Sequence, residues 1–160
     1  LDTLSFRAAI AQQRDAGAST LSYRAPYYVV EASTDLLGLK WRAAHEVLGA
    51  DNGIGFATPL ANGHRYQGWA DKFLSTPGDG LEDTWISLET RHERLGLTLR
   101  YHDFRAESSN TRFGQEVDLQ LQWTVNPRLT ATFKAAVFDS DAPERYNNTT
   151  KAWLMLQFRI

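Results

Sequence analysis

Three pairs of adjacent residues join a histidine to a carboxylate: His45-Glu46, His92-Glu93 and His102-Asp103. Imidazole and carboxylate groups are the usual partners in general acid–base catalysis, because both can exchange protons near neutral pH. Neighbouring side chains of a β-strand point to opposite faces, so no pair would meet directly in a β structure. The chain also has no Gly-x-Ser-x-Gly elbow and no His-Glu-x-x-His motif. We therefore predict that the protein is not an enzyme.

A group of acidic and amide side chains lies near the end of the chain, and its oxygen atoms could bind calcium. Their spacing is not that of an EF-hand loop, and acidic surface loops are commonly just solvated. Cysteine is absent, which excludes thiolate metal sites, iron–sulfur clusters and disulfides. We predict no metal and no cofactor. The residues of this acidic group are Asp139, Asp141, Glu144, Asn147 and Asn148.

Length and charge narrow the class of protein. The chain has 160 residues, enough for a single domain over residues 1–160. It has 17 Lys and Arg against 19 Asp and Glu, a net charge of -2, which argues against a nucleic-acid partner. No apolar run approaches the length of a transmembrane helix. Transmembrane β-strands need only about 9–11 residues of alternating character, so a membrane barrel is still open.

Alternation of polar and apolar residues is the dominant pattern. From Asp118 to Val125 it is strict, which gives a strand one apolar and one polar face. The pattern predicts an all-β fold with no helix. Eight strands are expected: Leu4–Ile10, Thr20–Ser33, Leu37–Ala44, Glu82–Arg91, Leu95–His102, Asp118–Val125, Leu129–Val137 and Leu154–Ile160.

Short and long connections alternate between these strands. Short ones are expected at Thr34–Leu36, His92–Arg94 and Asn126–Arg128, and long ones at Arg14–Ser19, Gly49–Gly80, Arg105–Arg112 and Asp139–Lys151. Outer-membrane barrels have short periplasmic turns and long extracellular loops. We therefore predict an antiparallel, transmembrane-type β-barrel of about eight strands. A soluble lipocalin-like barrel, or a plugged structural barrel without transport activity, is the alternative.

The polar face of the strands is where solute contacts would lie. On this parity it carries seven basic residues and three acidic ones, which predicts an electropositive lining that attracts an anionic or polar solute. The other interpretation is that these charges pair and fill a narrow lumen. The expected lining residues are Arg7, Lys40, Arg42, Arg91, Arg100, Lys134, Arg159, Glu46, Glu89 and Asp118.

Residues Gly49–Gly80 form the longest connection, and they are too apolar for a solvated tether. We expect this segment to lie against the inner wall or over the mouth, with Trp69 and Phe73 packed and the charged groups facing the lumen. Whether it gates or only plugs the lumen is open. Its candidate functional residues are His64, Arg65, Trp69, Asp71, Lys72 and Phe73.

The same segment carries a resemblance. Phe56–His64 reads Phe-Ala-Thr-Pro-Leu-Ala-Asn-Gly-His, and Gln67–Leu74 reads Gln-Gly-Trp-Ala-Asp-Lys-Phe-Leu. These stretches resemble the alginate-export family of outer-membrane β-barrels, and the likeness extends over roughly residues 50–160 through Gly80–Asp83 and Tyr101–Phe104. It implies a bacterial outer-membrane location, contact with lipid, and a porin-like channel for passive transport. Because the family's barrels are longer chains, it implies either their C-terminal part or a smaller barrel.

Aromatic residues at the ends of membrane strands form interfacial girdles. The alternative is ordinary core packing, which we prefer for Trp85 and Trp153 because their parity points them inward. The candidates are Trp41, Trp85, Trp123, Trp153, Tyr23, Tyr27, Tyr28 and Tyr101.

Overall fold

The computed structural model describes residues 4–58, 67–109 and 111–160. None of these residues lies in a helix, so the described part of the chain contains no helix that could span a membrane. The structure confirms the all-β prediction. Its strands are β1 (Ser5–Arg14), β2 (Arg24–Leu36), β3 (Leu39–Leu48), β4 (Ala50–Asp51), β5 (Ile54–Gly55), β6 (Leu81–His92), β7 (Leu95–Arg105), β8 (Arg112–Asn126), β9 (Leu129–Ser140) and β10 (Thr149–Phe158).

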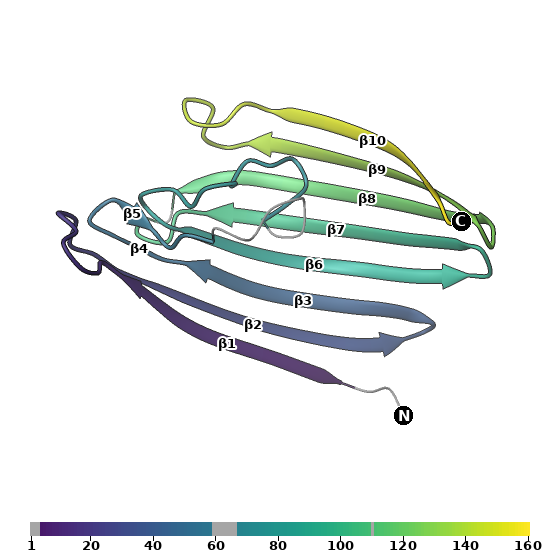
Figure 1. Ribbon diagram of the computed structural model, residues 1–160, viewed down its shortest axis with the longest axis horizontal. Coiled ribbons are helices and arrows are strands. Elements are labelled where there is room, and N and C mark those ends of the chain that lie inside the picture. Colours follow the sequence, from purple (N-terminus) through teal and green to yellow (C-terminus); the bar gives the residue numbers. More distant parts are fainter. Residues whose placement is uncertain (1–3, 59–66, 110) are drawn as a thin grey trace.

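Eight strands form one antiparallel sheet in the order β1-β2-β3-β6-β7-β8-β9-β10, and β4 pairs with β5 in a small hairpin. The three tight turns of the sheet lie at the end where both chain termini lie, and the long connections lie at the opposite end (Figure 1). The expected sorting of short and long connections is therefore present. Within the described residues β1 pairs only with β2 and β10 only with β9, so this sheet is open rather than closed.

Turn chemistry places the first tight turn later than expected. The sequence pattern predicted a connection over Thr34–Leu36, but β2 continues to Leu36 and the turn is Leu37-Gly38. Both turn residues have positive φ, 57° and 74°, which matches the twist of a two-residue hairpin. Glycine accepts this conformation readily, whereas Leu37 adopts it because the hairpin register leaves no alternative.

Strand β8 begins at Arg112, six positions before the expected Asp118, because a bulge interrupts the alternation. The register shifts between Phe104 and Arg105, where Arg105 pairs with Arg112 and Phe104 with Gly114. The extra residue, Phe113, is fully buried in the core. A bulge re-aims a side chain in this way, and no period-two pattern could have predicted it.

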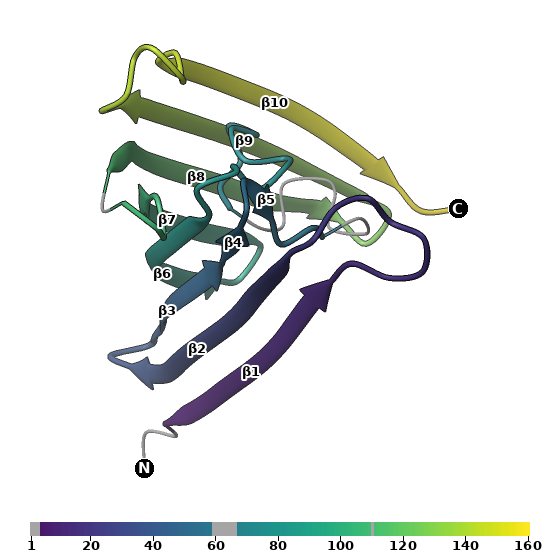
Figure 2. The ribbon, with the colours of Figure 1, turned by 90° about the vertical axis from the view of Figure 1, so that its left-hand side faces the viewer.

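The sheet curves around the β4–β5 hairpin and residues 67–80, which lie on its concave side (Figure 2). The convex face is apolar and exposed in its middle, over about four rows of cross-strand partners. Its exposed side chains include Phe6, Ile10, Val30, Ile86, Leu95, Leu99, Val117, Leu121, Trp123, Phe133, Val137, Leu154, Leu156 and Phe158. On β8 this band runs from Val117 to Trp123, about 20 Å along the strand.

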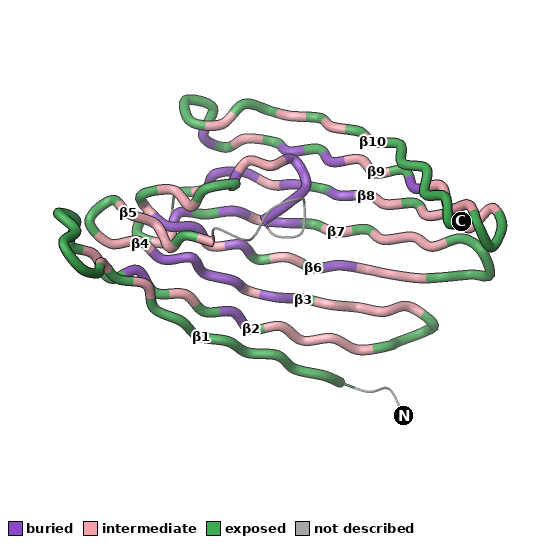
Figure 3. The backbone as a smooth tube through the Cα atoms, in the orientation of Figure 1, coloured by how far each residue is buried: buried purple, intermediate pink, exposed green. Residues whose placement is uncertain are grey.

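The hydrophobic core lies on the concave side, toward the end with the long connections, where buried residues gather on the strands and on the loop (Figure 3). Phe73 is central: its ring centroid lies 4.6 Å from that of Phe104, 5.1 Å from that of Tyr146 and 5.7 Å from that of Phe113. Tyr27 packs against this core and stacks on Phe56. Its prediction as a girdle residue is therefore wrong.

Candidate functional site

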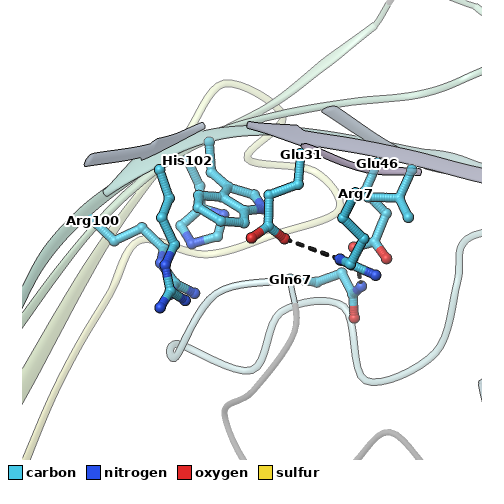
Figure 4. Close-up of a pocket in the computed structure, with 9 residues that line it drawn as sticks. Arg7, Glu31, Glu46, Gln67, Arg100 and His102 are labelled. Atoms are coloured by element: carbon cyan, nitrogen blue, oxygen red, sulfur yellow. Dashed lines mark hydrogen bonds and ion pairs between the residues drawn. The ribbon is translucent and has the colours of Figure 1, made fainter. Parts of the chain in front are cut away.

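The concave face holds a pocket of about 410 Å³ between the sheet and the loop. Five strands build its wall, and the loop contributes Gln67. Guanidinium, carboxylate and imidazole groups face one another across it (Figure 4). Its lining residues are Arg7, Val29, Glu31, Arg42, Glu46, Gln67, Trp85, Arg100 and His102.

The three arginines of this pocket differ in their partners. Arg7 is held by Glu31, with Nη2 3.1 Å from Oε2. Arg42 lies 3.7 Å from Glu89, a loose ion pair. Arg100 stands 4.6 Å above the ring of Trp85 and, among the described residues, has no carboxylate oxygen within 4.0 Å. Arg100 is therefore the cation of this pocket that is most available to a solute.

A second pocket of about 340 Å³ lies nearer the tight turns. It collects three more residues of the expected lining, Lys40, Glu89 and Arg91, together with Gln120 and Gln122. Most of the expected lining residues thus share the concave face, in two neighbouring pockets. Lys134 is 4.7 Å above the Trp69 ring, in contact with the loop, and Arg159 is exposed beyond β10, outside both pockets.

Sequence reasoning missed three acids of this face. Glu31 lines the first pocket, and Asp83 and Glu116 are buried on the same concave face. The concave face is therefore less basic than seven to three. Parity was the available signal for Glu31 and Asp83, which lie within the expected strands, whereas Glu116 lies before the expected start at Asp118.

Alternation places the two side chains of His45-Glu46 and of His102-Asp103 on opposite faces of the sheet, whereas His92 ends β6 and Glu93 lies in the turn that follows. His102 faces the concave side, where its Nδ1 is 2.8 Å from Asp83 Oδ1 and its Nε2 is 3.6 Å from Asp118 Oδ2. Asp103 instead accepts hydrogen bonds from Arg105 and Arg112. The neighbours of His102 are therefore found across strands and not along the chain.

The loop packs on the concave face of the sheet, where Trp69 and Phe73 are each only 6% exposed. Glu116 Oε1 accepts hydrogen bonds from the N–H groups of Trp69 and Ala70, at 2.5 and 2.7 Å. Three side-chain contacts add to this: Gln67 Nε2 donates to Glu46 Oε2, Lys151 Nζ donates to Asp71 Oδ2, and Lys72 Nζ lies 5.4 Å from the Phe138 ring centroid. His64 and Arg65 lie outside the described residues.

Neighbouring charges shift the pKa values of two side chains of the loop, Lys72 and Asp79. Partial burial and the positive charge of Lys151 lower the pKa of Lys72 from its usual 10.5. Two hydrogen bonds from the Arg145 guanidinium, 2.7 and 2.9 Å long, lower the pKa of Asp79 below its usual 3.8. The Arg145 guanidinium also lies 4.7 Å from the Phe113 ring centroid. This ion pair therefore ties the end of the loop to the β9–β10 connection.

Comparisons of the chain with protein-family models, with curated proteins and with solved structures find no match. The resemblance of residues 50–160 to the alginate-export family therefore stays a prediction, and the functional reasoning depends on the geometry described above.

Proposed function

We propose that this chain forms the wall and the constriction of an outer-membrane β-barrel, and that this barrel is a porin-like channel that passes an anionic or polar solute passively. The observation that carries the proposal is the distribution of polarity between the two faces of the sheet. Exposed apolar side chains cover the convex face, while Asp83, His102 and Glu116 are buried on the concave one. Lipid-facing apolar residues and a polar lumen are the pattern of transmembrane barrels.

The ends of the sheet support the same proposal. The three tight turns of the eight-stranded sheet lie at one end and its long connections at the other, as in outer-membrane barrels (Figure 1). Aromatic side chains lie on the convex face near both ends of the apolar band: Trp123 near the tight turns, and Tyr28 and Tyr101 toward the long connections. Amphipathic rings favour the two boundaries between hydrocarbon and water.

The hairpin and loop on the concave side favour a barrel whose wall has more than eight strands. An eight-stranded barrel has an interior just wide enough for its own side chains. Here the concave side also holds the β4–β5 hairpin and the anchored loop (Figure 2). In a membrane, the free edges of β1 and β10 would need hydrogen-bond partners. We therefore propose that further strands complete the wall, in agreement with the resemblance to a larger family barrel.

The polar path along the concave face is where the solute would pass. Among the described residues, Lys40, Arg91, Arg100 and Lys134 have no ion-pair partner, and fixed positive charge in a low-dielectric passage attracts anions. The acids Glu31, Glu46 and Glu89 limit this preference. The proposal is accordingly a weak anion preference and not exclusion of cations.

A permanently plugged barrel is the second candidate, and the burial of Trp69 and Phe73 favours it. Planar-bilayer recording separates the two. Reproducible conductance steps with a reversal potential that favours anions support the channel, whereas a folded, inserted protein that stays silent contradicts it. Deleting Asn62–Lys72 should enlarge the conductance if the loop narrows the passage. Unchanged steps in a folded deletion variant would contradict that role.

A further inference from the structure

The backbone around Gln67 and Gly68 has an unusual conformation for which its surroundings provide a reason. Gln67 has φ 52° and Gly68 φ 81°, both in the left-handed region. Successive backbone N–H groups of a turn can point toward one atom and make a small anion-binding nest. The N–H groups of Trp69 and Ala70 converge on a single atom, Glu116 Oε1.

The fit between loop and strand is close at this point. A Cβ added to Gly68 would lie 2.6 Å from Glu116 Oε2, so a larger residue there would displace the carboxylate. Glu116 itself is 1% exposed. A buried carboxylate that accepts two backbone hydrogen bonds makes stronger bonds than a neutral acceptor would. The strained loop conformation and the buried charge therefore stabilise each other.

A second carboxyl group lies beside this arrangement. Asp118 is two residues further along β8 on the same face and is fully buried. Asp118 faces His102 at 3.6 Å and lies opposite Arg100 in the register, whereas Glu116 faces the loop, whose Lys72 is close enough for their charges to interact.

We propose that Glu116 and the N–H groups of Trp69 and Ala70 form a latch that fixes the loop on the concave wall. The latch sets how much of the passage the loop occupies, and it positions Gln67 in the wall of the first pocket. The effect of this latch on transport rests on the proposed function. The latch itself can be tested without any conductance.

The absence of cysteine from the chain permits a direct test. Ala70, 2% exposed, is replaced by Cys, which keeps the backbone N–H, and the labelling rate with a maleimide is measured on the full chain folded in detergent. In this background E116Q should label roughly tenfold faster or more, because the charged acceptor is lost. D118N should label no faster than the A70C parent, because it leaves the Glu116 acceptor of both N–H groups in place.

Asp139 provides the matched control, since it is exposed and pairs with Gln115, the neighbour of Glu116. D139N should leave the rate unchanged.

An unchanged rate in folded E116Q would overturn the latch, and so would equal acceleration by D118N or D139N. If E116Q does not fold, G68A tests the same contact with Glu116 intact: faster labelling supports the latch and an unchanged rate overturns it. Silence in bilayers together with faster labelling of E116Q would contradict the channel and leave the latch supported.

Discussion

On the concave face, Asp83, His102, Glu116 and Asp118 are almost entirely buried, whereas on the convex face Leu154 is 74% exposed and Leu121 45% exposed. In a half-buried antiparallel sheet of a soluble protein the apolar face is covered and the polar one solvated. Here the described residues cover the polar face with a loop and leave the apolar face open. Alternation indicates that the two faces differ, and the position of the loop shows which of them is covered.

The largest expected effect comes from removing the aromatic centre of the covered face. F73A should lower the free energy of unfolding by about 3–5 kcal/mol, because the Phe73 ring packs against three phenylalanines and Tyr146. L74A is the matched control: Leu74 is 67% exposed, so it should change stability by less than about 0.5 kcal/mol. Denaturant unfolding of both variants gives the comparison. Equal, small effects would mean that the loop is not part of the core.

A charge placed on the convex face should have the next largest effect, and only in a bilayer. L121R should lower stability in lipid by about 2–4 kcal/mol, the cost of arginine near the middle of a membrane. Its neighbour Gln120 faces the second pocket on the concave side, so Q120R should have little effect. Urea unfolding of the vesicle-inserted protein measures both. If L121R and Q120R had the same effect, the two faces would not differ in their surroundings.

The smallest expected effect is at the rim of the concave face. The pKa of Asp79 is lowered by Arg145, so the stabilisation is present above the usual pKa of 3.8 and is lost as the pH falls below it. Because both side chains are partly exposed, it should amount to no more than about 1 kcal/mol. R145Q should remove this part of the pH dependence of stability between roughly pH 5 and 2. If the pH dependence of stability is unchanged in R145Q, other carboxylates cause the loss of stability in acid.

Much of the fold could be predicted from the sequence because period-two alternation is a local property. Segments such as Leu95–His102 and Leu129–Val137 have the expected strands at the expected faces. The start of β8 could not be predicted, because the bulge at Phe113 depends on how β7 and β8 pair. Closure of the sheet is likewise a property of distant edges, which no local pattern encodes.

The candidate site was predicted less completely. Parity placed Arg42, Arg100 and their neighbours on one face, but it could not tell that Glu31 pairs with Arg7. Trp69 and Phe73 were expected to pack because exposing them together is costly. The partner of the loop, Glu116, could not be predicted, since the contact joins residues 46 and 47 positions apart and depends on the backbone conformation at Gln67 and Gly68.

The central claim, that the convex face contacts lipid and the concave face does not, can be tested with two tryptophans. Trp123 is 51% exposed on the convex face, and Trp85 lines the first pocket on the concave one. Two variants that each retain only one of these residues, with the other tryptophans replaced by Phe, would be reconstituted into vesicles containing brominated lipid. Strong quenching of Trp123 fluorescence and little quenching of Trp85 is the expected result. Equal quenching of the two, or no quenching of Trp123 in a folded, vesicle-bound chain, would contradict the claim.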